Sequence, residues 1–513
     1  MADSLLTAGP AKLEVQVAYN QLQISLGSVR LGRGVTVGPL GRSGDYIAYP
    51  QLADVGWLVE EGQTARVSNL EVREVRGPHA LLYHNDGMAA AASGMKILCE
   101  PSYGGMPVLR NSFKLKKKEI ESATLYATAR GIYEICLNGE KVGADFLAPG
   151  LSQYNRHHYY QSYDVTKQLA KGKNEFLVSL AEGWWSGEIT FGNGNRNYFG
   201  DQLAFLASLH VKYTDGSTQT VVTDPSSWRV TTDGPVLYAS LFQGQVTDAR
   251  RSLADAQWKP AEEMDLDGHV SDATFGQTAP RTDEYDNWEL VPQEDPSPRV
   301  FTTLTAESVT EVRPGVYVYD MGQNFAGVPS ITLRNQKAGQ QVRFRFAEVL
   351  YPDLPEYQGN EGMLMLENIR GAMAQDIYVA SNESVQCFEP HFTQHGYRYL
   401  EITGVDQAPA IEDVKGLVIS SVQNFTAHYE SSNPLVNRLW DNIRWSMLGN
   451  FISIPTDCPQ RNERMGWSGD LSVFSRTATY LSDVDAFLTR HTQAIRDVQM
   501  PDGRMPDVAP IGG

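Results

Sequence analysis

The sequence has few cysteines: four among 513 residues, all far apart and none in a CxxC pair. A disulfide scaffold and a zinc cluster both rely on closely spaced cysteines, so neither is implied. We therefore expect no metal site and no cofactor.

Long apolar runs are also missing, since no stretch approaches the roughly 18 apolar residues of a membrane-spanning helix. The start, Met1–Leu6, has neither a basic region nor a long apolar core, and so is not a signal peptide. A signal that had already been removed would leave the same sequence. The compartment stays open between cytoplasmic and periplasmic or secreted.

Positive charge is scarce, because 43 Lys and Arg stand against 61 Asp and Glu, which gives a net charge of −18. An acidic surface repels phosphate backbones, which argues against binding to nucleic acid. The sequence also lacks a GxSxG motif, a phosphate-binding loop and a GxGxxG turn after a strand. These absences weigh against serine hydrolases and nucleotide-binding proteins.

Short alternating apolar runs are abundant up to about residue 425. Leu13–Val17, Leu209–Tyr213 and Val342–Phe346 alternate with a period of two. This pattern, with turn signals about every 8–12 residues, favours β-sandwiches over parallel α/β units. Three or four domains are expected, since one domain usually has about 100–200 residues. The stretch from Ala261 to Pro298 is rich in Asp, Glu and Pro, and we place a domain boundary within it.

Near residue 427 the apolar period becomes helical. Asn433 is a good N-cap and Pro434 suits the first helical position. Gly449 is a candidate end for this helix. Two further apolar-periodic stretches, 471–481 and 484–495, predict two more helices.

The connection between the first two of these helices, Asp457–Asp470, has an unusual density of polar groups. It holds three carboxylates, two arginines, Asn462 and Trp467. Several carboxylates beside an aromatic side chain suit glycoside hydrolysis, in which a carboxylic acid protonates the leaving oxygen. Glu463 is the candidate acid, because its longer side chain can reach out from a loop. Composition alone fits a structural salt-bridge loop equally well.

The charges around Glu463 set a condition on this role. A general acid is protonated before it reacts, and nearby carboxylates and Trp467 favour that state. Arg461 and Arg464 favour the ionised carboxylate, so at least one of them should point elsewhere. Gly466 and Gly469 are expected to break the helix and keep the polar groups on a loop.

The string from Asp457 to Asp470 closely resembles the D-C-P-Q-R-(D/N)-E-R-(L/M)-G-W-x-G-D signature of α-L-rhamnosidases of glycoside hydrolase family 78. The resemblance implies that Glu463 is the general acid and that the two terminal aspartates contact rhamnose hydroxyls. Asn462 stands where many members have Asp. We expect substrate contacts from the remaining polar and aromatic members of the string as well, which gives the binding set Asp457, Arg461, Asn462, Trp467 and Asp470.

The resemblance covers roughly residues 105–513. The segments that resemble the family's N-terminal jelly-roll module and the next β-sandwich are Asn138–Gly143, Asp145–Leu151, Tyr160–Thr166, Gly183–Trp185, Tyr319–Asn324, Ala347–Leu350, Glu367–Gly371 and His395–Tyr399. Residues 1–80 resemble part of a lectin-like sandwich more faintly, in Asp54–Trp57 and Ala65–Val67.

The implied fold class is multidomain and mainly β, with successive β-sandwich or jelly-roll domains before the first helices of an (α/α)6 barrel. The expected domains are a lectin-like β-sandwich portion over 1–80, a jelly-roll module over 81–260, a second β-sandwich over 261–426 and an incomplete catalytic domain over 427–513. A toroid of twelve helices needs on the order of 200 residues, so less than half of it is expected here.

The resemblance implies hydrolysis of terminal α-L-rhamnosyl linkages with inversion. We expect the catalytic base to come from a C-terminal part that this sequence lacks. The alternatives are a non-catalytic fragment that acts as a carbohydrate-binding β array, and a subunit completed by another chain. The expected partner is a rhamnose-containing glycoside or polysaccharide, with no nucleic acid and no membrane span, and a homodimer is left open.

Overall fold

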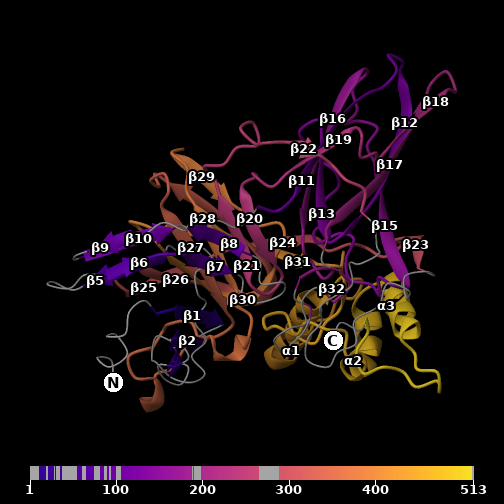
Figure 1. The fold of residues 1–513 in the computed structure, drawn as a ribbon. Coiled ribbons are helices and arrows are strands. Elements are labelled where there is room, and N and C mark those ends of the chain that lie inside the picture. The colour runs from indigo at the N-terminus through magenta and orange to yellow at the C-terminus, as the bar shows by residue number, and fades with distance from the viewer. Residues whose placement is uncertain are drawn as a thin grey trace.

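The computed structural model describes residues 105–187, 189, 198–200, 202–264 and 288–510. In the first 99 residues it describes shorter stretches, namely 11–18, 21–27, 29–30, 35–36, 55–59, 65–73, 81–85, 89–91 and 94–99. Figure 1 shows indigo N-terminal strands, purple and orange sandwiches, and yellow helices at the C-terminal end.

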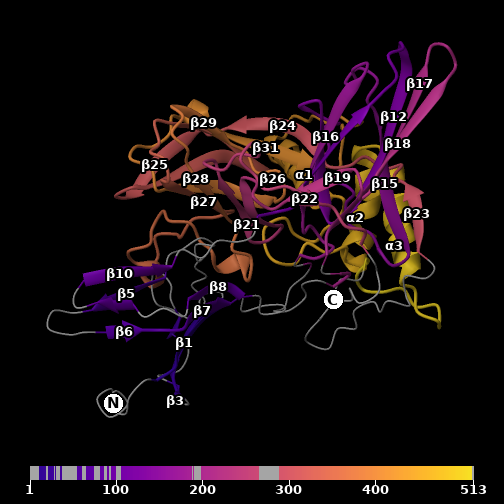
Figure 2. The same cartoon turned by 45° about the horizontal axis from the view of Figure 1, so that its top comes forward.

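The described N-terminal stretches are mostly short antiparallel strands. They are β1 (Leu13–Ala18), β2 (Gln21–Leu26), β3 (Val29–Arg30), β4 (Val35–Thr36), β5 (Val55–Val59), β6 (Ala65–Val67), β7 (Leu70–Arg73), β8 (Leu81–Asn85), β9 (Ala89–Ala91) and β10 (Gly94–Cys99). β1 to β4 share one sheet, and β5–β10, β6–β9 and β7–β8 pair separately. These strands lie beside the orange sandwich, on the side away from the helices (Figures 1 and 2). The expected lectin-like portion over 1–80 stays a prediction, and Asp54 lies outside the described residues.

The first sandwich has a six-stranded sheet, β14-β13-β16-β11-β19-β22, and a five-stranded sheet, β18-β17-β12-β15-β23. Its strands are β11 (Val108–Lys114), β12 (Ile120–Arg130), β13 (Ile132–Leu137), β14 (Glu140–Lys141), β15 (His157–Asp164), β16 (Lys173–Ala181), β17 (Ala204–Tyr213), β18 (Thr218–Val222), β19 (Trp228–Thr231), β22 (Lys259–Pro260) and β23 (Glu289–Pro292). Leu125, Val178 and Leu209 lie in the core between the sheets. The alternating apolar side chains that predicted these strands therefore face a buried core.

The second sandwich is built on a ten-stranded sheet around the long strand β26. Its strands are β20 (Val236–Ser240), β21 (Gly244–Asp248), β24 (Arg299–Thr305), β25 (Ser308–Arg313), β26 (Val316–Arg334), β27 (Gln341–Ala347), β28 (Gln375–Val379), β29 (Val385–Phe388), β30 (His395–Thr403) and β31 (Val414–Ser420). The short 3-10 turns η2 (Pro355–Tyr357), η3 (Glu367–Ile369) and η4 (Ile411–Asp413) lie on its connections.

The two sheet systems cross the boundary expected between 260 and 261. β20 and β21 precede it but join the second sandwich, where β21 pairs in parallel with β28. β23 follows it but pairs in parallel with β15 of the first sandwich. Residues 265–287 of the expected linker lie outside the described residues. Strand patterns alone do not say which sheet a strand joins, because any exposed edge offers the same backbone groups.

The three predicted helices are confirmed as α1 (Pro434–Asn450), α2 (Ser468–Leu481) and α3 (Asp485–Asp497). The Asn433 side chain caps α1 by accepting from the Leu435 amide at 3.0 Å. The expectation that Gly469 breaks the helix is wrong, because α2 already begins at Ser468. None of the described helices is long and apolar enough to cross a membrane.

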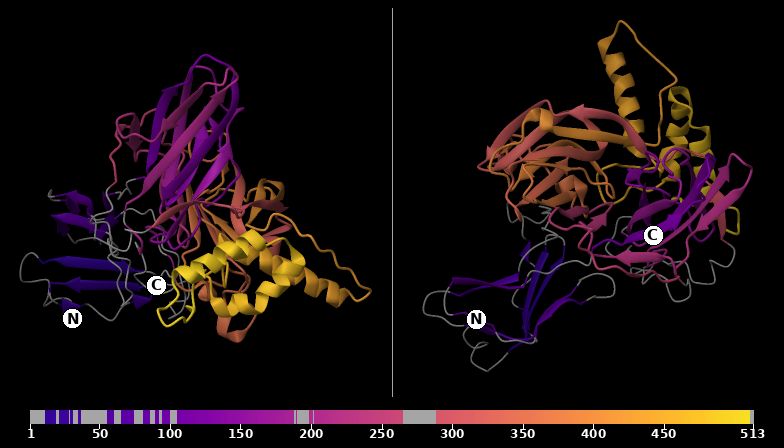
Figure 3. Two further views of the ribbon diagram at one scale, coloured as in Figure 1. Left: turned by 90° about the vertical axis from the view of Figure 1, so that its right-hand side faces the viewer. Right: turned by 90° about the horizontal axis from the view of Figure 1, so that it is seen from above.

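The helices pack on the sandwich and on one another. Figure 3 shows them grouped beside the orange strands, and α1 contacts β26 and β31. Their own core includes Met447, Phe451, Leu481 and Phe487. Between α1 and α2 the chain forms the short pair β32 (Phe451–Ile452) and β33 (Ile454–Pro455), from which the polar loop departs.

One glycine brings the second sandwich close to this loop. A Cβ atom on Gly396, in β30, would lie 2.7 Å from the carbonyl carbon of Pro459 and 2.9 Å from the Gln460 nitrogen. Only glycine allows the two backbones to approach this closely.

Candidate active site

The polar loop is closed on itself by Asp457. The Met465 amide donates to Asp457 Oδ1 at 2.9 Å, and the Asp457 amide donates to the Met465 carbonyl at 3.2 Å. These two bonds bring the ends of the nine-residue segment 457–465 together, so its polar side chains are held in one place.

Arg464 anchors the loop to the second sandwich. Its side chain is buried and donates to the carbonyl oxygens of Leu241 at 2.7 Å, Gln394 at 2.9 Å, Gln460 at 3.2 Å and Arg461 at 3.0 Å. Burial lowers the pKa of this guanidinium to about 10. The expectation that one arginine points away from Glu463 is confirmed, since the Arg464 guanidinium donates its hydrogen bonds to backbone carbonyl oxygens.

Arg461 is the arginine that faces the carboxylates. Its Nε donates to Glu463 Oε2 at 2.8 Å and its Nη2 donates to Asp457 Oδ2 at 3.1 Å. The side chains of Glu463 and Asp457 are only 10% and 6% exposed. A shared guanidinium therefore holds two nearly buried carboxylates together.

A second arginine reaches Glu463 from the sandwich, which the sequence did not reveal. Arg370 follows η3, and its Nη1 donates to the same oxygen, Glu463 Oε2, at 3.1 Å. The next residue, Gly371, donates its amide to Asn462 Oδ1 at 3.0 Å. The side-chain oxygen of Asn462 thus accepts a hydrogen bond from the backbone of the sandwich. Its expected contact with substrate stays a prediction.

Glu348 is a further carboxylate near Arg461. The amide groups of Asn324 and Asn368 donate to its two oxygens at 2.9 Å and 3.4 Å. Burial raises the pKa of Glu348, although the bond from Asn324 and the charge of Arg461 oppose the rise. The sequence connects Glu348 and Asn368 with the site only through the family resemblance of their segments, because nothing in their spacing places them at the loop.

Trp467 and Asp470 lie at the start of α2. Trp467 precedes the helix and pairs with Val508, and the Ser468 amide donates to the Asp507 carbonyl at 2.8 Å. Asp470 is exposed in the first turn of α2. Within the described residues no hydrogen bond or ion pair joins Asp470 to Glu463 or Asp457. The substrate roles of Trp467 and Asp470 stay predictions.

Cys458 completes a group of potential metal ligands with Asp457 and Glu463, whose ligand atoms lie within 4.8 Å of one another. Burial and the adjacent Asp457 raise the pKa of the Cys458 thiol to about 12, so it is a poor nucleophile. Arg461 already donates to both carboxylates and supplies the positive charge that they need. We therefore interpret Asp457 and Glu463 as a carboxylate pair bridged by Arg461, and not as metal ligands.

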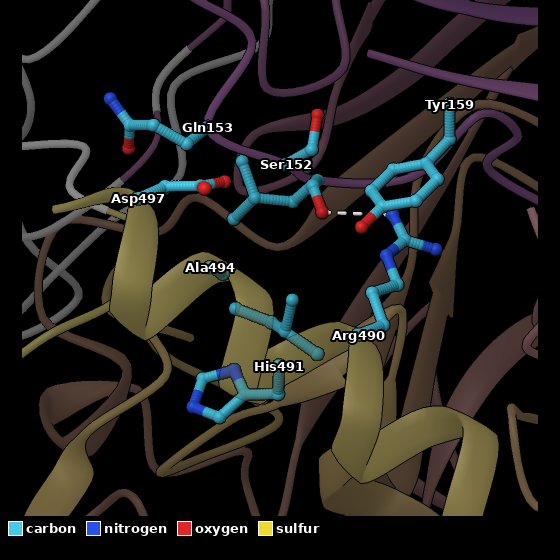
Figure 4. A pocket seen from close by; sticks show the side chains of 9 residues that line it. Ser152, Gln153, Tyr159, Arg490, His491, Ala494 and Asp497 are labelled. Atoms are coloured by element: carbon cyan, nitrogen blue, oxygen red, sulfur yellow. Dashed lines mark hydrogen bonds between the residues drawn. The ribbon is translucent and has the colours of Figure 1, made fainter. Parts of the chain in front are cut away.

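A small pocket lies beside α3, at its contact with the first sandwich (Figure 4). It is lined by Leu151, Ser152, Gln153, Tyr159, Ile454, Arg490, His491, Ala494 and Asp497. Arg490 donates to the Leu151 carbonyl at 2.9 Å, the bond drawn in Figure 4, and pairs with Asp295 at 3.2 Å. The space holds about one water molecule. The pocket is therefore an interface feature and too small for a sugar.

Three family models match the chain. Residues 118–281 match the α-L-rhamnosidase N-terminal domain, and residues 310–420 match the bacterial α-L-rhamnosidase concanavalin-like domain. Residues 424–513, which hold the helices and the polar loop, match the bacterial α-L-rhamnosidase six-hairpin glycosidase domain.

Curated relatives and solved structures agree with these models. An α-L-rhamnosidase of Streptomyces avermitilis is 39% identical over 79% of this chain and 37% of its own length. One from Alteromonas sp. (strain LOR) is 32% identical over 83% of this chain and 44% of its length. The crystal structure of the Streptomyces avermitilis α-L-rhamnosidase complexed with L-rhamnose superimposes with a TM-score of 0.70 at 36% identity, over 82% of this chain and 40% of that one. The native enzyme from Aspergillus terreus gives 0.69 at 29% identity, over 98% of this chain and 55% of that one.

The helical segment 424–513, which follows two β-sandwiches, matches a glycosidase domain, so the chain has the architecture of a glycoside hydrolase. The chain belongs to the α-L-rhamnosidase family, glycoside hydrolase family 78. It spans about 37–44% of the length of the first curated relatives that it matches.

Proposed function

We propose that this chain carries the acid half of a site that hydrolyses terminal α-L-rhamnosyl linkages with inversion. Glu463 is the general acid, and Asp457, Arg461, Asn462, Trp467 and Asp470 form the substrate-binding set. The observation that carries the proposal is the position of Glu463, which is 90% buried and held beside Asp457 by the shared Arg461.

The bonding of Glu463 leaves one of its two carboxyl oxygens available to a substrate. Both bonds to its carboxyl group use Oε2. Among the described residues none bonds Oε1, so this oxygen is the one that carries the proton to the glycosidic oxygen. In an inverting hydrolase a second carboxylate, about 6.5–9.5 Å from the acid, activates a water molecule on the opposite face of the sugar. We assign no residue of this chain to that second role.

The test is the release of L-rhamnose from methyl α-L-rhamnoside, whose methoxide leaving group needs protonation, by this chain and by Glu463→Gln. Loss of a general acid should lower the rate by about 10²- to 10⁴-fold. Gln keeps the size of the side chain and its ability to accept from Arg461, so an effect of this size reports the lost proton. A variant as fast as the wild type would refute the role of Glu463.

Binding of L-rhamnose, measured by calorimetry, separates the alternative function. A chain that binds L-rhamnose but cleaves nothing would act as a carbohydrate-binding β array. Cleavage that appears only when a second polypeptide is added would support a complementing subunit.

A further inference from the structure

The sandwich segment that reaches Glu463 is fixed in place along its backbone. The Gly371 amide donates to Asn462 of the polar loop at 3.0 Å, and the Gly371 carbonyl accepts from Gln243 Nε2 at 3.4 Å. Arg370 itself has a φ of +52°, a left-handed conformation that a non-glycine residue keeps only when its surroundings impose it. The backbone that carries the Arg370 side chain is thus held in a fixed position.

Arg370 lies further out than the other partner of Glu463. Its side chain is 53% exposed, against 28% for Arg461 and 10% for Glu463. A hydrolase that removes a terminal sugar encloses that sugar and leaves the rest of the substrate toward solvent. The acid protonates the oxygen between the two parts, so the outer partner of the acid lies on the side of the leaving group.

We propose that Arg370 of the second sandwich is a positioning residue for Glu463 and forms the leaving-group side of the site. This rests on the proposed function of Glu463. Arg370 and Arg461 together fix the Oε2 edge of the carboxyl group, so that Oε1 faces the glycosidic oxygen. The same sandwich segment carries Asn368, which donates to Glu348, so the sandwich supplies a polar wall beside the catalytic loop.

The charged groups around Glu463 define what removal of Arg370 changes. Glu463 contacts the two guanidiniums of Arg370 and Arg461, and Arg461 also contacts Asp457 and lies near Glu348. Without Arg370, one cation faces three carboxyl groups. The orientation of the Glu463 carboxyl group then becomes looser, because Oε2 keeps only the donor from Arg461.

The matched control is Arg334→Gln. Arg334 is on the same sandwich, is 55% exposed, and pairs with Asp413 at 2.8 and 2.9 Å, with no part of the catalytic loop involved. Its removal costs a similar surface ion pair. Arg370→Lys is the conservative variant, which keeps the charge and loses the rigid guanidinium.

The first experiment compares Arg370→Gln with wild type on two substrates. A p-nitrophenolate leaves with little help from an acid, whereas the methoxide of methyl α-L-rhamnoside needs protonation. We expect kcat/KM to fall about tenfold or more on the methyl glycoside and less than about threefold on the nitrophenyl glycoside. Complete loss of a general acid costs roughly 10²- to 10⁴-fold, so a misplaced acid should lose only a part of that effect. Arg370→Lys should recover only part of the loss on the methyl glycoside, because it keeps the charge and loses the planar guanidinium. Equal losses on both substrates, the result of a purely structural role, would overturn the proposal.

A second measurement does not need turnover. Water-soluble carbodiimides modify protonated, accessible carboxyl groups, and peptide mass spectrometry gives the rate at Glu463. We expect a rise of about threefold or more in Arg370→Gln and no change in Arg334→Gln. If the wild-type chain cleaves neither substrate, hydrolysis by this chain alone is refuted, and the labelling rate at Glu463 decides whether Arg370 positions it. An unchanged rate overturns it.

Discussion

An ion pair between the two sandwiches should make stability depend on pH in the alkaline range. His391, in the loop before β30, places Nδ1 2.8 Å from Glu134 Oε2 on β13, and its Nε2 lies 3.6 Å from Glu389. Lys141 also pairs with Glu134. Burial alone lowers the pKa of His391, but the two glutamates outweigh it and raise the pKa to about 9, while the pKa of Glu134 falls to about 2.

The size and direction of the effect follow from this difference. A histidine whose pKa rises from 6.5 to about 9 on folding contributes about 3 kcal/mol at 1.4 kcal/mol per pH unit. Since the side chain is 32% exposed, we discount this to about 2 kcal/mol. The contribution is fully present below pH 6.5 and is lost as the pH rises through about 9, because the folded state then releases its proton.

The assay is urea unfolding at pH 6, 7, 8, 9 and 10, followed by circular dichroism, for wild type and His391→Gln. The difference in unfolding free energy between the two proteins should shrink by about 2 kcal/mol from pH 6 to pH 10. Subtraction removes the other titrating groups that both proteins share. In a Glu134→Gln background the shrinkage should largely vanish. A difference that stays constant across this range would refute the reasoning.

Two further predictions concern the anchoring of the polar loop. Arg464→Met should lower the free energy of unfolding by about 3–5 kcal/mol, because buried carbonyl oxygens including those of Leu241 and Gln394 lose their donor. A loss under about 1 kcal/mol in chemical denaturation would contradict the anchoring role of Arg464. Gly396→Ala should cost about 1–3 kcal/mol in thermal or urea unfolding and slow rhamnoside cleavage, because the new Cβ meets backbone atoms of the loop. Gly469→Ala is the control, because its Cβ would meet nothing within 4 Å, and it should leave stability unchanged or slightly higher. Equal losses of stability in both glycine variants would argue against a steric cause.

The helical region shows how far local patterns reach. Asn433 and Pro434 predicted the start of α1, and the described cap bond to Leu435 is the interaction that the pattern implies. Gly469 misled the same reasoning, since a glycine in the first turn of a helix costs little there and the packing of α2 decides the outcome.

The sequence by itself determined the short-range features: strands by alternation, helices by caps and period, and the family through the string Asp457–Asp470. These features depend on backbone geometry within a few residues, so spacing is enough to predict them. The same string also restricted the acid to a few carboxylates. It could not say which arginine would face them.

Only the tertiary structure decided what surrounds Glu463. Arg370 is 93 residues away in sequence, and Arg464 finds an acceptor in Leu241, 223 residues away. Whether such groups meet depends on how sheets and helices pack, including the crossing of β20 and β21 into the second sandwich. Packing is a property of whole surfaces, and no local spacing encodes it.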